Sequence, residues 1–192
     1  MPRLLAEGLA ERGHDVHLVT SGRGRGTKRY SAADAEAPGP VPHHVVDHPA
    51  DAHAAPHARP GPHGQWRWQR AAAAVIATID QEAPIDVVHH VGPLSLSATG
   101  WLAPTAPPTV LGPVLGGEVA PGPFVRYLAD GQRREALHRH VTRRMLPRVP
   151  VLRRQLETAG LALAATPETA RLVATLGARH IEVEPAIALP RQ

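Results

Sequence analysis

The chain of 192 residues contains no cysteine. This absence excludes disulfide bridges, thiolate metal ligands and a cysteine nucleophile. Aromatic residues make up only 3% of the sequence and do not alternate with basic residues, so the stacking surface typical of nucleic-acid binding is missing. No apolar run approaches the roughly 18 residues that a membrane-spanning helix needs, and the opening residues lack the zones of a secretory signal. We therefore expect a cytoplasmic protein that does not bind nucleic acid.

Positive charge is unevenly distributed along the chain. The formal net charge is +4, and residues 133–154, whose pattern is helical, carry eight of the arginines. These are Arg133, Arg134, Arg139, Arg143, Arg144, Arg148, Arg153 and Arg154. A solvated helix face is the simplest interpretation of such a run, and a surface for an anionic partner, including peripheral contact with a membrane, is the alternative.

Helical and strand patterns alternate along the sequence. Helices are predicted at 2–12, 65–82, 94–103, 123–130, 132–157 and 167–176. Strands are predicted at 14–20, 41–46, 85–90, 109–111, 161–165 and 181–183. Pro147 and Pro150 should kink or split the long helix at 132–157. This alternation predicts a doubly wound, parallel, Rossmann-like α/β sheet in a single domain spanning residues 1–192.

A glycine-rich loop follows the strand predicted at 109–111. Its residues are Gly112, Pro113, Val114, Leu115, Gly116, Gly117 and Glu118. Glycine lacks a Cβ, so its backbone can approach a ligand closely, and open α/β sheets bind ligands at the carboxyl ends of their strands. We therefore predict that Gly112, Pro113, Gly116, Gly117 and Glu118 bind substrate. Glu118 would either accept hydrogen bonds from substrate hydroxyls or cap the next helix.

Histidines form the second group of candidates. His89 and His90 end the strand at 85–90, and because side chains alternate along a strand, at most one of them should face a ligand. Both are candidate substrate-binding residues. The alternative is that each is simply a packed or solvated histidine. Six others gather at 43–63, namely His43, His44, His48, His53, His57 and His63. They lack the fixed spacing of metal ligands, so no metal site is predicted.

Two further patterns carry no chemistry of their own. Residues 21–26 alternate glycine and arginine, but the spacing G-x-G-x-G with no helix directly after it does not match a dinucleotide-binding loop. A flexible loop is the simpler interpretation, although Arg23 and Arg25 could attract a phosphorylated acceptor. The sequence shows no order of residues typical of a hydrolase, and it identifies no catalytic residue.

A resemblance to a known family rests on stretches that follow one another along the chain. They are residues 5–20, 85–90, 112–118 with Ala120 and Pro121, and 165–169 leading to 176–178. In this order they resemble the amino-terminal domain of retaining glycosyltransferases of the GT-B fold, the large family-four group. Such a domain holds the sugar acceptor, while a second domain holds most of the nucleotide-sugar donor. The resemblance implies no metal cofactor.

The resemblance also implies parts that this sequence does not carry. In the family a strand with a glycine loop would come before Met1, and the donor domain would come after Gln192. We therefore expect the acceptor-side half of a retaining hexosyltransferase, which would bind a nucleotide-diphosphate sugar only together with a second domain or a partner chain. The alternative is a non-catalytic binding or assembly module, either a remnant or one half of a split enzyme.

Overall fold

The structure is a computed structural model that describes residues 2–21, 41–46, 62–91, 95–96, 107–119 and 121–185. The chain divides into two compact units, Met1–Pro84 and Ile85–Gln192. We call them unit 1 and unit 2. The prediction that residues 1–192 form one domain stays a prediction.

The described residues of unit 1 include α1 (Pro2–Ala10), β1 (Leu18–Ser21), β2 (His43–Val46) and α3 (Pro62–Glu82). The strands pair in parallel from Leu18 opposite His43 to Ser21 opposite Val46. Trp68 of α3 packs with Val46 and Ala72, and its indole N–H donates to the Val46 carbonyl at 3.2 Å. This bond allows the indole nitrogen to be buried together with its ring.

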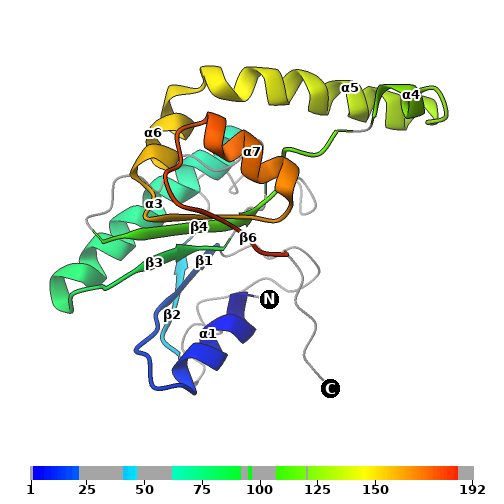
Figure 1. Cartoon of the computed structure of the whole chain (residues 1–192). Helices are drawn as coiled ribbons and strands as arrows, with labels where there is room; N and C mark the ends of the chain where they lie inside the picture. The colour runs from blue at the N-terminus through cyan, green and yellow to red at the C-terminus, as the bar shows by residue number, and fades with distance from the viewer. Residues whose placement is uncertain are drawn as a thin grey trace. The chain divides into compact units, whose positions relative to one another are not determined.

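Unit 2 contains a parallel sheet in the order β3-β4-β5-β6. The strands are β3 (Val88–His90), β4 (Thr109–Val114), β5 (Leu161–Ala164) and β6 (Ile181–Val183). The helices are α4 (Gly122–Val125), α5 (Asp130–Met145), the short 3-10 helix η1 (Leu146–Arg148), α6 (Pro150–Thr158) and α7 (Pro167–Thr175). Figure 1 shows the long α5, with α4 at its far end, extending beyond α6 and α7.

The core of unit 2 joins the sheet to α6 and α7. Its members from these elements and the end of α7 include Leu111, Val114, Ala162, Leu152, Leu156, Leu172, Val173 and Leu176. Apolar residues at 152 and 156, and at 172 and 176, are four apart, which places each pair on one face of its helix. Thr166 caps α7, Pro167 begins it, and Gly177 at φ 103° follows its end.

Several boundaries differ from the predicted ones. The strand predicted at 109–111 continues to Val114, because a register shift between Leu111 and Val114 accommodates the Gly112-Pro113 pair. The predicted split of the long helix is confirmed, since α5 ends at Met145 and α6 begins at Pro150. Most of the helix predicted at 94–103 lies outside the described residues. Within it, Ser95 is not helical and instead bridges to Leu115.

The coarse fold class is therefore a mixed α/β structure. Every described strand pair is parallel, which is compatible with a Rossmann-like fold. The predicted loop at 22–26 and the histidines at 48, 53 and 57 lie outside the described residues.

Candidate functional site

The first part of the predicted loop belongs to the sheet. Gly112 lies in β4 with φ 118°, and a Cβ on it would collide with the carbonyl oxygen of Leu163 in β5. A side chain would therefore force the two strands apart at this position. The peptide bond between Gly112 and Pro113 is cis. In the structure, these two residues form part of the carboxyl end of β4.

The second part of the loop packs directly on α7. A Cβ on Gly117 would overlap the backbone of Glu168 and Thr169 in the first turn of that helix. Gly116 has φ 143°, and a Cβ on it would lie 3.4 Å from Leu96. The glycine pair thus lets the loop lie against the beginning of α7, which is a structural use of the close approach that glycine allows.

Glu118 lies at the centre of a hydrogen-bond network between the loop and α7. One carboxylate oxygen, Oε2, accepts the Gly116 N–H at 2.9 Å. The other, Oε1, accepts the hydroxyls of Thr166 and Thr169, both at 2.6 Å. These distances are typical of charge-assisted O–H···O bonds.

The two threonine hydroxyls complete the network. Each hydroxyl has one proton, which it donates to Glu118, so each oxygen can accept from a backbone amide. Thr166 Oγ1 accepts the Thr169 N–H at 3.2 Å and so caps α7, and Thr169 Oγ1 accepts the Gly117 N–H at 3.1 Å. We call Gly116, Gly117, Glu118, Thr166 and Thr169 the Glu118 network.

The network determines the charge state of the glutamate. Burial raises the pKa of Glu118, but hydrogen bonds from Thr166, Thr169 and the backbone amides outweigh it, and the net pKa is below its ordinary value. At neutral pH the half-buried carboxylate is therefore ionised, beside the amino end of α7, where a helix favours negative charge. The helix that Glu118 approaches is not the next one in the sequence but α7, whose N-cap Thr166 lies 48 residues later.

The strand β3 places the two histidine candidates differently. His89 is exposed and lies with Nε2 at 2.9 Å from the Gly112 carbonyl oxygen, to which a protonated Nε2 donates. His90 is buried, with 6% of its surface exposed. The predicted alternation of the pair is confirmed. The structure thus brings His89 to Gly112, and it brings Gly116, Gly117 and Glu118 to α7, while contact of any of them with a substrate stays a prediction.

Sequence reasoning did not select Thr166 and Thr169 as site residues. The pattern Thr166-Pro167 was an available signal, because threonine is a common N-cap and proline favours the first helical position. Their bonds to Glu118 could not be predicted, since nothing in the sequence indicates which acid approaches a given helix terminus.

A second polar cluster lies in unit 1. The rings of His17 and His44 approach with Nδ1 of the first 3.0 Å from Nε2 of the second, and His43 Nε2 lies 2.7 Å from the Thr20 hydroxyl. Burial, followed by the charges of His17 and His43, lowers the pKa of His44, against a raising effect of Glu82. Among the described residues, no group of three or more acids and histidines could hold a metal ion.

Comparisons with known proteins do not assign the chain to a family. No protein-family model matches it, and no curated protein matches it in sequence. Within the described parts of the chain, no helix has the length and apolar character required to cross a membrane. The glycosyltransferase interpretation therefore rests on the sequence resemblance and on the geometry above.

Proposed function

We propose that this chain is the acceptor-side half of a retaining hexosyltransferase, with a doubly wound sheet of the GT-B type. The observation that carries the proposal is the position of the Glu118 network, which holds a glycine-rich loop after the carboxyl end of β4. Parallel α/β sheets bind their ligands outside that end of the sheet.

In the proposed reaction the loop positions an acceptor hydroxyl. Transfer from a nucleotide-diphosphate sugar requires a well-placed acceptor and stabilisation of the departing diphosphate. The loop would supply the first of these. The ionised Glu118 would hold the loop in shape through its bond to the Gly116 N–H. Alternatively, it would contact the acceptor directly. The groups that stabilise the diphosphate would come from a second domain or a partner chain.

The test is calorimetry with the purified chain, titrating uridine- and guanosine-diphosphate sugars with and without a separately produced donor domain. We expect binding and sugar transfer only when both parts are present. Glu118→Gln should reduce transfer, and Glu135→Gln should not, because Glu135 is an exposed acid paired with Arg139 on α5. Donor binding by the chain alone would contradict the division into two halves.

The alternative is a non-catalytic binding or assembly module. The observation that favours it is that both Glu118 oxygens already accept hydrogen bonds from within unit 2, as expected of a purely structural carboxylate. Failure to bind or transfer any sugar in the presence of a donor domain would support this alternative over the transferase.

A further inference from the structure

An apolar stripe runs along the exposed face of α5. Leu137, Val141 and Met145 are spaced four residues apart, which aligns their side chains on one face of the helix. Their exposed fractions are 64%, 51% and 52%. Leu146, which follows directly in η1, is buried, whereas no residue of α5 itself is buried. We call Leu137, Val141 and Met145 the α5 stripe.

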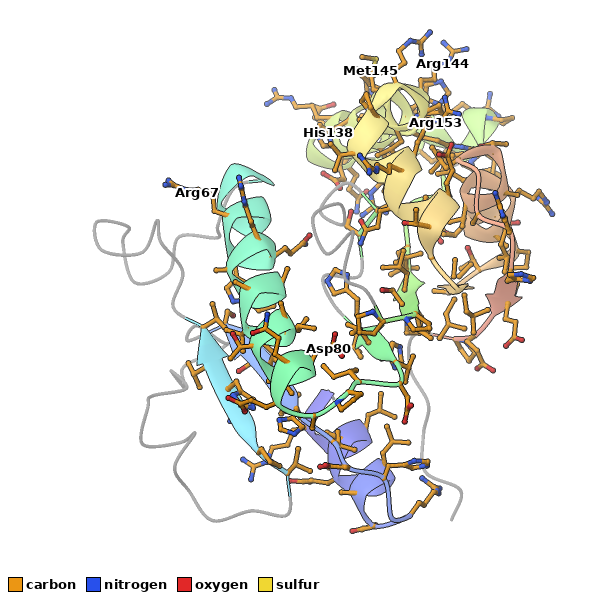
Figure 2. The ribbon with its side chains drawn as sticks, turned by 90° about the vertical axis from the view of Figure 1, so that its left-hand side faces the viewer. Arg67, Asp80, His138, Arg144, Met145 and Arg153 are labelled. Atoms are coloured by element: carbon orange, nitrogen blue, oxygen red, sulfur yellow. The ribbon has the colours of Figure 1, made fainter. Side chains whose placement is uncertain are left out.

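Arginines flank the α5 stripe. The helix contains five arginines and two acids. Helical spacing puts Arg133 and Arg134 one turn before Leu137, and it puts Arg144 one turn after Val141. Figure 2 shows Arg144 and Met145 together at the outer edge of this unit.

The acids of α5 do not neutralise this face. Glu135 pairs with Arg139 at 2.9 Å, away from the stripe, and Asp130 at the helix start lies 3.6 Å from Arg133. Among the described residues, Arg134, Arg143 and Arg144 have no ion-pair partner. The exposed face of α5 is therefore both apolar and positively charged.

Exposed aromatic side chains lie just before α5. Phe124 in α4 and Tyr127 after it are both exposed, and the Arg126 guanidinium lies 4.8 Å from the Tyr127 ring centroid. Aromatic and aliphatic side chains interleaved with arginine are typical of helices that lie in a membrane interface, where arginine reaches the headgroups while its stem stays in apolar surroundings.

We propose that α5 docks on the surface of an anionic lipid bilayer, with the α5 stripe inserted and the flanking arginines on the headgroup phosphates. A second copy of the chain fits this face poorly. Three apolar side chains fall short of the roughly 1,200 Å² that a stable interface buries, and a symmetric pair would bring the arginines that flank the stripe in one copy toward those in the other. The proposal does not depend on sugar transfer.

Vesicle co-sedimentation of the full chain tests this surface. We expect binding to anionic vesicles, phosphatidylcholine with about 30% phosphatidylglycerol, weak binding to pure phosphatidylcholine, and release in high salt. The double variant Arg134→Gln/Arg144→Gln should reduce the partition coefficient about 25-fold, at about fivefold for each arginine. Leu137→Gln/Val141→Gln should reduce it about tenfold, because less apolar surface inserts.

A matched control removes two charges elsewhere. Arg171→Gln/Arg179→Gln alters exposed arginines of α7 and the turn after it and should leave binding within about twofold of the unmodified chain, an amount small beside the change of about fivefold per interfacial arginine. Equal loss in this control would overturn the proposal, because binding would then follow total charge. Loss on removing arginines with none on removing Leu137 and Val141 would also overturn it, since a soluble polyanion or an acidic protein would explain that result.

A site-specific probe measures insertion directly. The chain has no cysteine, so Val141→Cys can be labelled alone with a polarity-sensitive fluorophore. Its emission should shift to the blue with phosphatidylglycerol vesicles, while a label at Ala174→Cys, an exposed position of α7, should not respond. No shift at position 141 in the bound protein would contradict insertion of the α5 stripe.

Discussion

Replacing Glu118 by glutamine tests whether the carboxylate fastens the loop after β4 to α7. The carboxylate accepts one amide and two hydroxyl donors. Glutamine keeps one acceptor oxygen, which can serve both threonine hydroxyls, but its NH₂ group then faces the Gly116 N–H. One hydrogen bond is lost, at about 1 kcal/mol, and the other two lose their charge assistance, at about 0.5 to 1 kcal/mol each. Because the group is only half-buried, we expect a net loss of about 2 kcal/mol.

Urea unfolding measures this loss. With a slope of about 2 kcal/mol per M, the midpoint should fall by about 1 M at neutral pH with the slope unchanged. Because the folded-state pKa of Glu118 is lowered, the stability it contributes is present above the unfolded pKa and disappears as the pH falls through the folded pKa. The difference between the original chain and Glu118→Gln should therefore shrink on acidification below about pH 4.5, near the ordinary value of 4.5.

A double-mutant cycle with Thr166→Val separates this network from other effects. If the two side chains interact as the 2.6 Å bond indicates, Glu118→Gln should cost about 0.5 to 1 kcal/mol less in the Thr166→Val background, because the charge assistance of that bond is already absent. An equal cost in both backgrounds would refute the reasoning, as would a midpoint shift that does not depend on pH.

Three other predictions concern single positions. Gly117→Ala should destabilise the chain by about 1 to 3 kcal/mol in urea unfolding, because its Cβ would meet backbone atoms of α7; Gly122→Ala, where a Cβ meets nothing within 4 Å, is the control, and equal effects would contradict the explanation. Thr166→Ala should cost about 1 to 2 kcal/mol through loss of the α7 cap; no change in thermal unfolding would argue against the cap. Because the pKa of His44 is lowered, the stability that its neutral form contributes is present above the unfolded pKa and lost as pH falls. His44→Gln should therefore reduce the acid sensitivity of unfolding between about pH 7 and 5, and NMR should find that His44 titrates below its ordinary value of 6.5.

Local signals in the sequence predicted where some helices end, but not where β4 ends. The run of alanines in α3 favours a helix until the approach to Pro84, and α3 ends at Glu82. Pro147 and Pro150 divide the long arginine-rich helix because proline lacks an amide proton for the helical ladder. In β4 the corresponding prediction is wrong, because Gly112-Pro113 predicts the end of the strand and β4 continues to Val114. A shift in register keeps the strand paired across them, and such a shift depends on the neighbouring strand.

The position of the candidate site could be predicted from the sequence, but its hydrogen bonds could not. Glycine content and position after a strand selected residues 112–118, and these residues do meet at the carboxyl end of β4. The partners of Glu118 lie 48 and 51 residues further along the chain. Bonds at that separation are decided by how the helix packs on the sheet, so no local pattern could identify them.

A loss of ligand binding on mutation of the Glu118 network has two explanations: the carboxylate positions the loop, or it contacts the ligand directly. Gly117 brings its amide to Thr169, and Thr169 in turn donates to Glu118, so a change at any of these positions moves the whole loop. Loss of ligand binding in Glu118→Gln alone would therefore not show that the carboxylate touches a substrate. Thr169→Val removes a hydroxyl bonded to both the Gly117 amide and Glu118 while leaving the carboxylate charged, so it serves as the comparison. If binding falls equally in both variants, Glu118 acts by positioning the loop. If it falls much further in Glu118→Gln, at comparable unfolding midpoints, the carboxylate meets the acceptor directly.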